Sequence, residues 1–110
     1  MSAGFKIRIA GTKIECGPNG GSGKFKHKTA LTWEGQNHGD DPFTLQFFAD
    51  GGNKKTPKWP FDGPPPIPPS SITTPFTRTL AEITVDQVSF AYSISKQGND
   101  TLDPIIIVVR

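Results

Sequence analysis

The stretch FTLQF, residues 43–47, places a bulky apolar side chain at every second position. Side chains of a β-strand point alternately to opposite faces, so this period of two indicates a strand with one face in a core. The same alternation occurs in FKIRI, residues 5–9, and in VSFAYSI, residues 88–94. Glycine and proline are abundant, with 12 and 11 copies among 110 residues, and both favour short strands joined by turns over helices.

Further extended segments are expected at residues 12–16, 24–34, 76–85 and 105–109. No segment has a convincing helical pattern. We therefore predict an all-β fold, an antiparallel two-sheet Greek-key sandwich of seven or eight strands, with a small barrel as the alternative. A length of 110 residues fits a single domain over residues 1–110. The continuous β-branched run at 105–109 predicts a strand that is covered on both faces.

The charge and hydropathy of the sequence argue against two classes of partner, nucleic acids and membranes. The net charge of +2 is too small for a specialised nucleic-acid binder, so nucleic acid is an unlikely partner. No apolar run approaches the roughly 20 residues that span a bilayer, and no membrane association is expected. The opening residues lack the pattern of a secretory signal, which predicts a cytoplasmic location. The oligomeric state stays open.

Three side chains decide whether nucleophilic chemistry is plausible. Cys16 is the single cysteine, so an internal disulfide cannot form, and we expect it to be a small buried apolar residue. His27 alternates with lysines on a predicted strand, and His38 lies in a loop rich in glycine and aspartate. These residues form no connected set of acid, base and nucleophile, so we expect a protein that is not an enzyme.

Two pairs of segments carry a resemblance to a known fold. ALTWE, residues 30–34, followed by FTLQF, resembles the third and fourth strands of the cupredoxin-like sandwich, and FAYSI, residues 90–94, with the apolar run at 105–109, resembles its last two strands. An immunoglobulin-like sandwich uses the same alternation. The resemblance implies architecture without copper. Ile94 stands where the family has its cysteine ligand, and Met1 is the only methionine. We expect no cofactor.

A cation or small-ligand site is the weaker of two functional predictions. Carboxylates of two loops could gather at one end of the sandwich, where oxygen ligands suit Ca²⁺. The residues concerned are His38, Asp40, Asp41, Asp100 and Asp103. Aspartates beside glycine and asparagine are more often turn formers.

The stronger prediction concerns the long proline-rich loop at about 50–71, which holds seven of the 11 prolines up to residue 69. Lys58, Trp59 and Phe61 lie in it, outside any strand alternation. Two large aromatic residues could anchor a protein partner. They could also fold back and plug one edge of the sandwich. We predict a non-enzymatic binding or assembly module that contacts a protein partner through this loop.

Overall fold

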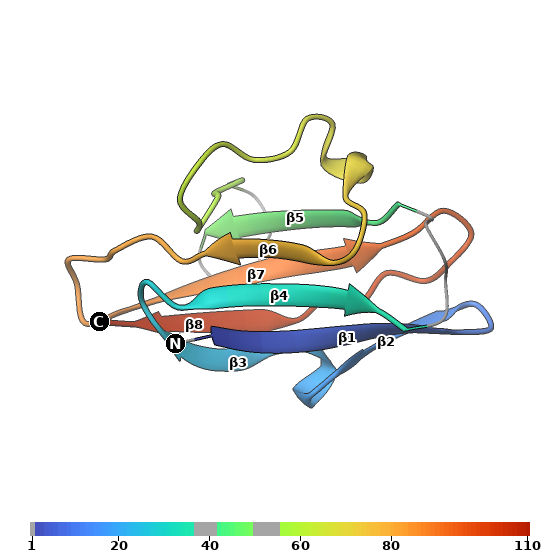
Figure 1. Ribbon diagram of the computed structural model, residues 1–110, viewed down its shortest axis with the longest axis horizontal. Coiled ribbons are helices and arrows are strands. Elements are labelled where there is room, and N and C mark those ends of the chain that lie inside the picture. The colour runs from blue at the N-terminus through green and yellow to red at the C-terminus, as the bar shows by residue number, and fades with distance from the viewer. Residues whose placement is uncertain (1, 37–41, 50–55) are drawn as a thin grey trace.

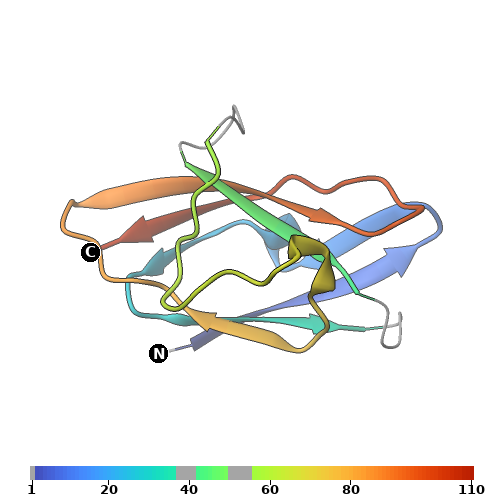
Figure 2. The ribbon, with the colours of Figure 1, turned by 90° about the horizontal axis from the view of Figure 1, so that it is seen from above.

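The computed structural model describes residues 2–36, 42–49 and 56–110. Two four-stranded β-sheets lie face to face and enclose one core (Figure 1). Figure 2 shows the strands of the two layers crossing at an angle. The prediction of an all-β two-sheet sandwich is confirmed. No helix in the described ranges has the length and apolar character needed to cross a membrane.

The strands follow the predicted segments closely. They are β1 (Ser2–Ala10), β2 (Lys13–Gly17), β3 (Gly23–Lys26), β4 (Ala30–Gly35), β5 (Thr44–Ala49), β6 (Phe76–Thr79), β7 (Gln87–Ser95) and β8 (Ile105–Val109). Two short 3₁₀ turns, η1 (Asn19–Gly21) and η2 (Pro69–Ser71), lie between them. Sheet A has the strand order β2-β1-β4-β6, and sheet B has the order β3-β8-β7-β5. Strands β5 and β6 are therefore edge strands.

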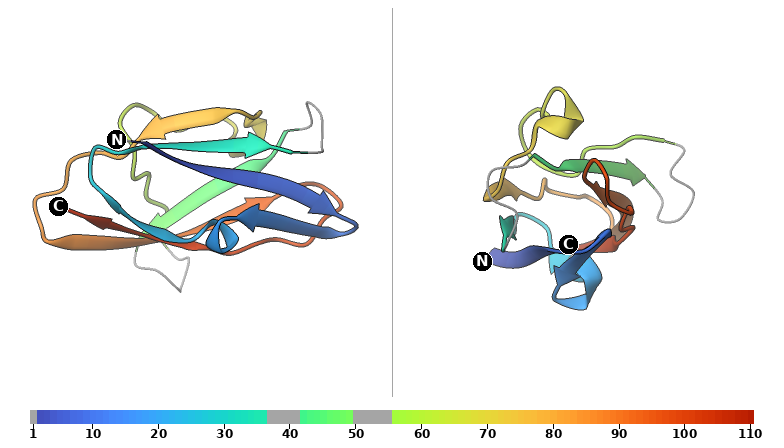
Figure 3. Two further views of the ribbon diagram at one scale, coloured as in Figure 1. Left: turned by 60° about the horizontal axis from the view of Figure 1, so that its bottom comes forward. Right: turned by 90° about the vertical axis from the view of Figure 1, so that its right-hand side faces the viewer.

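The prediction that the sheets are purely antiparallel is wrong. Strand β1 runs parallel to β4, with Phe5 opposite Trp33, and β3 runs parallel to β8, with Phe25 opposite Val108. The pairings β1/β2, β4/β6, β5/β7 and β7/β8 are antiparallel. Parallel neighbours need a crossover connection. The chain supplies one by passing from one sheet to the other between β1 and β4, as Figure 3 illustrates.

The segment 24–34 was expected to be one extended run, and the structure divides it. Lys28 adopts a φ of +67°, so the chain turns there and passes from β3 in sheet B to β4 in sheet A. The expectation that residues 105–109 are covered on both faces is also wrong. Ile106 and Val108 are buried, whereas Ile105 is 39% exposed on the opposite face. One face of β8 thus meets the core and the other lies near solvent.

The core is built around aromatic rings. Trp33 of β4 is fully buried and stacks on Phe5, with ring centroids 5.4 Å apart. In sheet B, Phe47 of β5 stacks on Tyr92 of the neighbouring strand β7, with ring centroids 4.6 Å apart. The Tyr92 hydroxyl accepts a hydrogen bond from Trp33 Nε1 at 3.4 Å and donates one to the carbonyl of Gly21. Each polar tip of these large buried rings therefore has a partner, as burial requires.

Candidate functional site

Residues 56–72, here called the proline arm, connect the edges of the two sheets. At the β5 end, Ala49 N–H donates to the carbonyl of Thr56 at 2.8 Å, and Lys58 N–H donates to that of Phe47 at 2.9 Å. The arm then reaches β6, where Asp62 N–H donates to the carbonyl of Thr79 at 2.9 Å. Figures 1 and 2 show the arm running along the side of the sandwich where β5 and β6 lie. Its first part therefore closes the open side between the two sheets.

Phe61 forms the plug of this closure. Its side chain is only 4% exposed and meets Phe47 and Trp33 edge-to-face, with ring centroids 5.1 and 5.9 Å apart. Phe61 also forms an isolated antiparallel bridge with Leu80, which is fully buried. Burying a phenylalanine side chain stabilises a fold by roughly 1.5–3 kcal/mol. Of the two roles that the sequence left open, partner anchor or plug of the sandwich, Phe61 has the second.

Trp59 lies at the boundary between core and surface. Its ring is half-buried and meets Phe47 and Phe61 at 5.6 and 5.1 Å. Its indole nitrogen Nε1 is buried, and no acceptor for its hydrogen is found among the described residues. An unpaired buried donor costs about 1–3 kcal/mol, which the packing of the ring must offset.

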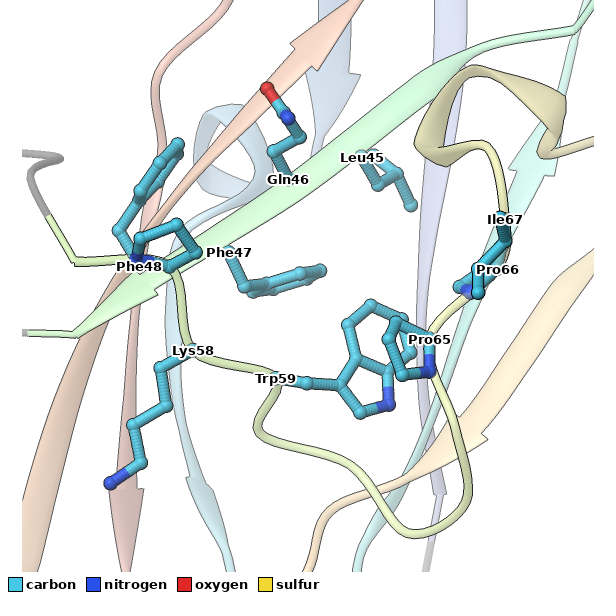
Figure 4. A pocket seen from close by; sticks show the side chains of 10 residues that line it. Leu45, Gln46, Phe47, Phe48, Lys58, Trp59, Pro65, Pro66 and Ile67 are labelled. Carbon is cyan, nitrogen blue, oxygen red and sulfur yellow. The ribbon is translucent and has the colours of Figure 1, made fainter.

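The second part of the arm leaves a groove beside β5, here called the β5 groove. It is a cavity of about 360 Å³ that is open to one side. Figure 4 shows β5 side chains on one side, the prolines of the arm on the other and the Trp59 ring between them. Its lining consists of Leu45, Gln46, Phe47, Phe48, Pro57, Lys58, Trp59, Pro65, Pro66 and Ile67. Ile67 stands on the rim and is 88% exposed, more than any other large apolar side chain described.

Sequence reasoning found Lys58 and Trp59 but missed the other lining residues. A usable signal was present in two places. Phe48 continues the apolar residues of 43–47 onto the outward face, and Ile67 is the only residue other than proline at positions 64–69. An apolar side chain inside a polyproline run has no neighbour along the chain that can cover it. Residues 50–55 of the predicted loop lie outside the described residues.

The residues of the predicted cation site are not brought together in what the structure describes. His38, Asp40 and Asp41 lie outside the described residues. The carboxylate of Asp103 accepts a hydrogen bond from Ser93 Oγ at 3.1 Å, and Asp100 N–H donates to the carbonyl of Thr12 at 2.7 Å. Within residues 2–36, 42–49 and 56–110, no three or more His, Cys, Asp or Glu side chains form a group that could hold a metal ion.

His27 and Cys16 both have structural positions. His27 Nδ1 accepts a hydrogen bond from Ile83 N–H at 3.1 Å, which leaves that nitrogen occupied. Cys16 is 6% exposed, as expected of a small buried residue, and burial raises the pKa of its thiol to about 12. The thiol is therefore protonated at neutral pH, and a protonated thiol is a poor nucleophile.

No protein-family model, no curated protein and no solved structure matches the chain. The β5 groove is therefore interpreted from its own geometry.

Proposed function

We propose that this chain is a non-enzymatic binding or assembly module, and that it contacts another protein through the β5 groove. The observation that carries the proposal is an apolar cavity of about 360 Å³ beside an edge strand, with Ile67 exposed on its rim. Ligand sites are typically concave, mostly apolar and supplied with few polar groups. Lys58 is the only ionisable residue among the ten that line the groove.

The energetic argument rests on what covering the groove would remove from water. Apolar area contributes roughly 25 cal/mol per Å² when it is buried. Ile67 and the rings of Phe48 and Trp59 are large apolar side chains that a partner can cover without rearranging the core. Contiguous exposed apolar patches are uncommon on monomers and often mark interaction sites.

A non-enzymatic role is supported by the positions of the reactive side chains. His27 Nδ1 already accepts a hydrogen bond, and the Cys16 thiol holds its proton because it is buried. Both lie away from the lining of the β5 groove. The groove itself offers polar contacts from Gln46 and Lys58, which suit recognition rather than bond cleavage.

For the fold, we propose the cupredoxin-like arrangement over the immunoglobulin-like one. The parallel pairs β1/β4 and β3/β8 support it, because the immunoglobulin sandwich consists of two antiparallel sheets. The segments that carried the resemblance supply β4 and β5, and β7 beside β8 in sheet B. This proposal concerns architecture and implies no copper site.

The test is capture of a partner from native lysate by immobilised protein. Ile67→Asp places a charge on the rim of the groove, and Val85→Asp is the matched control, because Val85 is 53% exposed and does not line the groove. We expect a partner to be retained by the wild type and by Val85→Asp and to be lost with Ile67→Asp. Equal retention by all three proteins, with equal thermal unfolding, would contradict the use of this groove.

A further inference from the structure

The proline arm contains a run, residues 64–67, whose conformation is set by its sequence, PPPI. A proline fixes its own φ at about −65°, and a residue that precedes a proline is restricted to extended conformations. Pro64 and Pro65 meet both conditions, so their backbone is that of polyproline II. Residues 64–66 contain no turn or bend. The run is therefore extended before any partner is present.

The exposure of this run follows the symmetry of polyproline II. This helix has about three residues per turn, so Pro64 and Ile67 lie on one side, and Pro65 and Pro66 take the other two sides. Pro64, Pro65 and Ile67 are exposed, whereas Pro66 is half-buried. Pro66 therefore faces the body of the protein. The other three side chains form an apolar surface that faces solvent, here called the proline ridge.

The backbone of the run offers hydrogen-bond acceptors and almost no donors. Ile67 has the only backbone N–H of residues 64–68. In the described part of the chain, no backbone N–H donates to a carbonyl of residues 64–67. Polyproline II has no internal hydrogen bonds. These carbonyls are therefore available to donors of a second molecule.

Both ends of the run are held by the fold. Before it, Asp62 N–H donates to the carbonyl of Thr79 at 2.9 Å. After it, Ile72 exchanges two hydrogen bonds with Phe43, at 2.7 and 3.2 Å. Ordering a flexible segment costs free energy on binding, and a segment with fixed ends and fixed φ angles avoids much of that cost. The proline ridge is thus presented in a preorganised form.

We propose that the proline ridge is the ligand of a polyproline-binding domain, a partner whose groove is lined by aromatic side chains. This inference rests on the proposed binding function and names the class of partner. Polyproline II segments dock in such grooves. Rings of the partner pack against Pro64, Pro65 and Ile67, and its indole N–H or phenol O–H groups donate to the carbonyls of the run.

The chemistry of the run favours this partner over two other kinds of protein. A partner that adds a β-strand needs N–H groups on this chain, and positions 64, 65, 66 and 68 have none. A strongly charged partner needs a charge to contact, and residues 64–68 carry none. Aromatic rings with polar hydrogens complement both the apolar side chains and the free carbonyls.

The test is a calorimetric titration of the whole protein with a panel of purified SH3 and WW domains. We expect at least one domain to bind, and to lose binding when a tryptophan of its own groove is changed to alanine. Pro65→Ala and Ile67→Asp should each weaken binding at least about tenfold, because each removes a side chain of the ridge. Two matched controls should change the affinity by less than about threefold. They are Pro66→Ala, on the inner side of the run, and Pro42→Ala, at an exposed proline outside the arm.

A second readout is the mapping of backbone amide chemical shifts in the protein. The Ile67 amide is the only one at residues 64–68, and it should shift when the domain is added. Amides of β2 should not shift, because β2 is at the edge of sheet A opposite to β6. All variants should keep the thermal unfolding temperature of the wild type, so that weaker binding reports the lost contact.

Three results would overturn the inference. The first is a panel in which no domain binds, or in which binding survives both Pro65→Ala and Ile67→Asp. The second is an equal loss for Pro65→Ala and Pro66→Ala, which contradicts the ridge. The third is self-association that is lost with Ile67→Asp, which assigns the ridge to a second copy. If a lysate partner depends on Ile67 while no polyproline-binding domain binds, the binding function stands and the polyproline mode is wrong.

Discussion

The two parts of the proline arm differ in proline content and in structure: two of the seven residues 56–62 are prolines, against four of the five residues 64–68. Residues 56–62 are bonded to both sheets and place Phe61 in the core at 4% exposure. Of residues 64–68, Pro65, Pro66 and Ile67 line an open groove, and Ile67 is 88% exposed. In the first part, Pro57 and Pro60 are separated by residues that still donate hydrogen bonds. In the second part, consecutive prolines leave almost no donor. The part with few, separated prolines closes the sandwich, and the part with almost continuous proline lines the groove.

The largest expected loss of stability comes from a substitution in residues 56–62, the closed part of the arm. Phe61→Ala removes a buried ring that meets both Trp33 and Phe47, and we expect a loss of about 3–5 kcal/mol in the free energy of unfolding. Urea denaturation followed by circular dichroism measures it. Ile67→Ala is the control from the open part. Equal losses in the two variants would show that the two parts of the arm do not differ as described.

Alkaline pH should weaken the buried core next. Burial raises the pKa of Cys16 from 9.0 to about 12, and it also raises the pKa of Tyr92. Above pH 9 the unfolded chain loses these protons while the folded chain keeps them, so the free energy of unfolding falls as pH rises towards 12. We expect a loss of about 3 kcal/mol from Cys16 alone by pH 11.

Urea midpoints between pH 8 and pH 11 measure this loss, with Cys16→Ala as the control. The alanine variant should start from a lower stability and show a shallower decline. A stability that stays level to pH 11 in the wild type would contradict the burial of both groups. Residues 64–68 contribute nothing to this dependence, because none of them has an ionisable side chain.

A smaller effect is expected at Trp59, which lies at the boundary between core and surface. Trp59→Phe keeps an aromatic ring against Phe47 and removes the indole N–H that has no acceptor among the described residues. Lost packing and the removed unpaired donor act in opposite directions, so the free energy of unfolding should change by less than about 1 kcal/mol. Thermal unfolding measures it, and a loss as large as that of Phe61→Ala would show that Trp59 contributes to the core as much as Phe61 does.

The smallest change in stability is expected in residues 64–68, the open part of the arm. Ile67→Ala removes an exposed side chain that contributes little to the core, and the free energy of unfolding should stay within about 0.5 kcal/mol of the wild type. The same urea experiment measures it. A clear destabilisation would show that Ile67 is covered in solution, and the groove would then be occupied by the chain itself.

Alternation along the chain was enough to predict the sandwich, because residues 43–47 and 88–94 must each bury one face. It was not enough for the strand pairing. The parallel partner of β1 lies beyond a hairpin and a change of sheet, and no local pattern records it. The turn at Lys28 was missed because neither glycine nor proline marks it, although φ is positive there.

At the candidate site, local sequence patterns are even less able to predict which side chains are buried. Trp59 and Phe61 are two residues apart in an irregular loop, and nothing in their immediate sequence says that one enters the core and the other lines a groove. The burial of Phe61 depends on Leu80, which pairs with it through an isolated β-bridge although it is distant in the sequence.

The order of strands in sheet B also has a consequence for synthesis on the ribosome. Strand β8 lies between β3 and β7, so residues 105–109 fill the interior of a sheet whose other members are made earlier. A nascent chain cannot complete this sheet until those residues leave the exit tunnel. Until then, the edges of β7 and β3 that pair with β8 have no neighbour, and unpaired strand edges of this kind promote aggregation. A chain cut before Ile105 should therefore be recovered only in insoluble form.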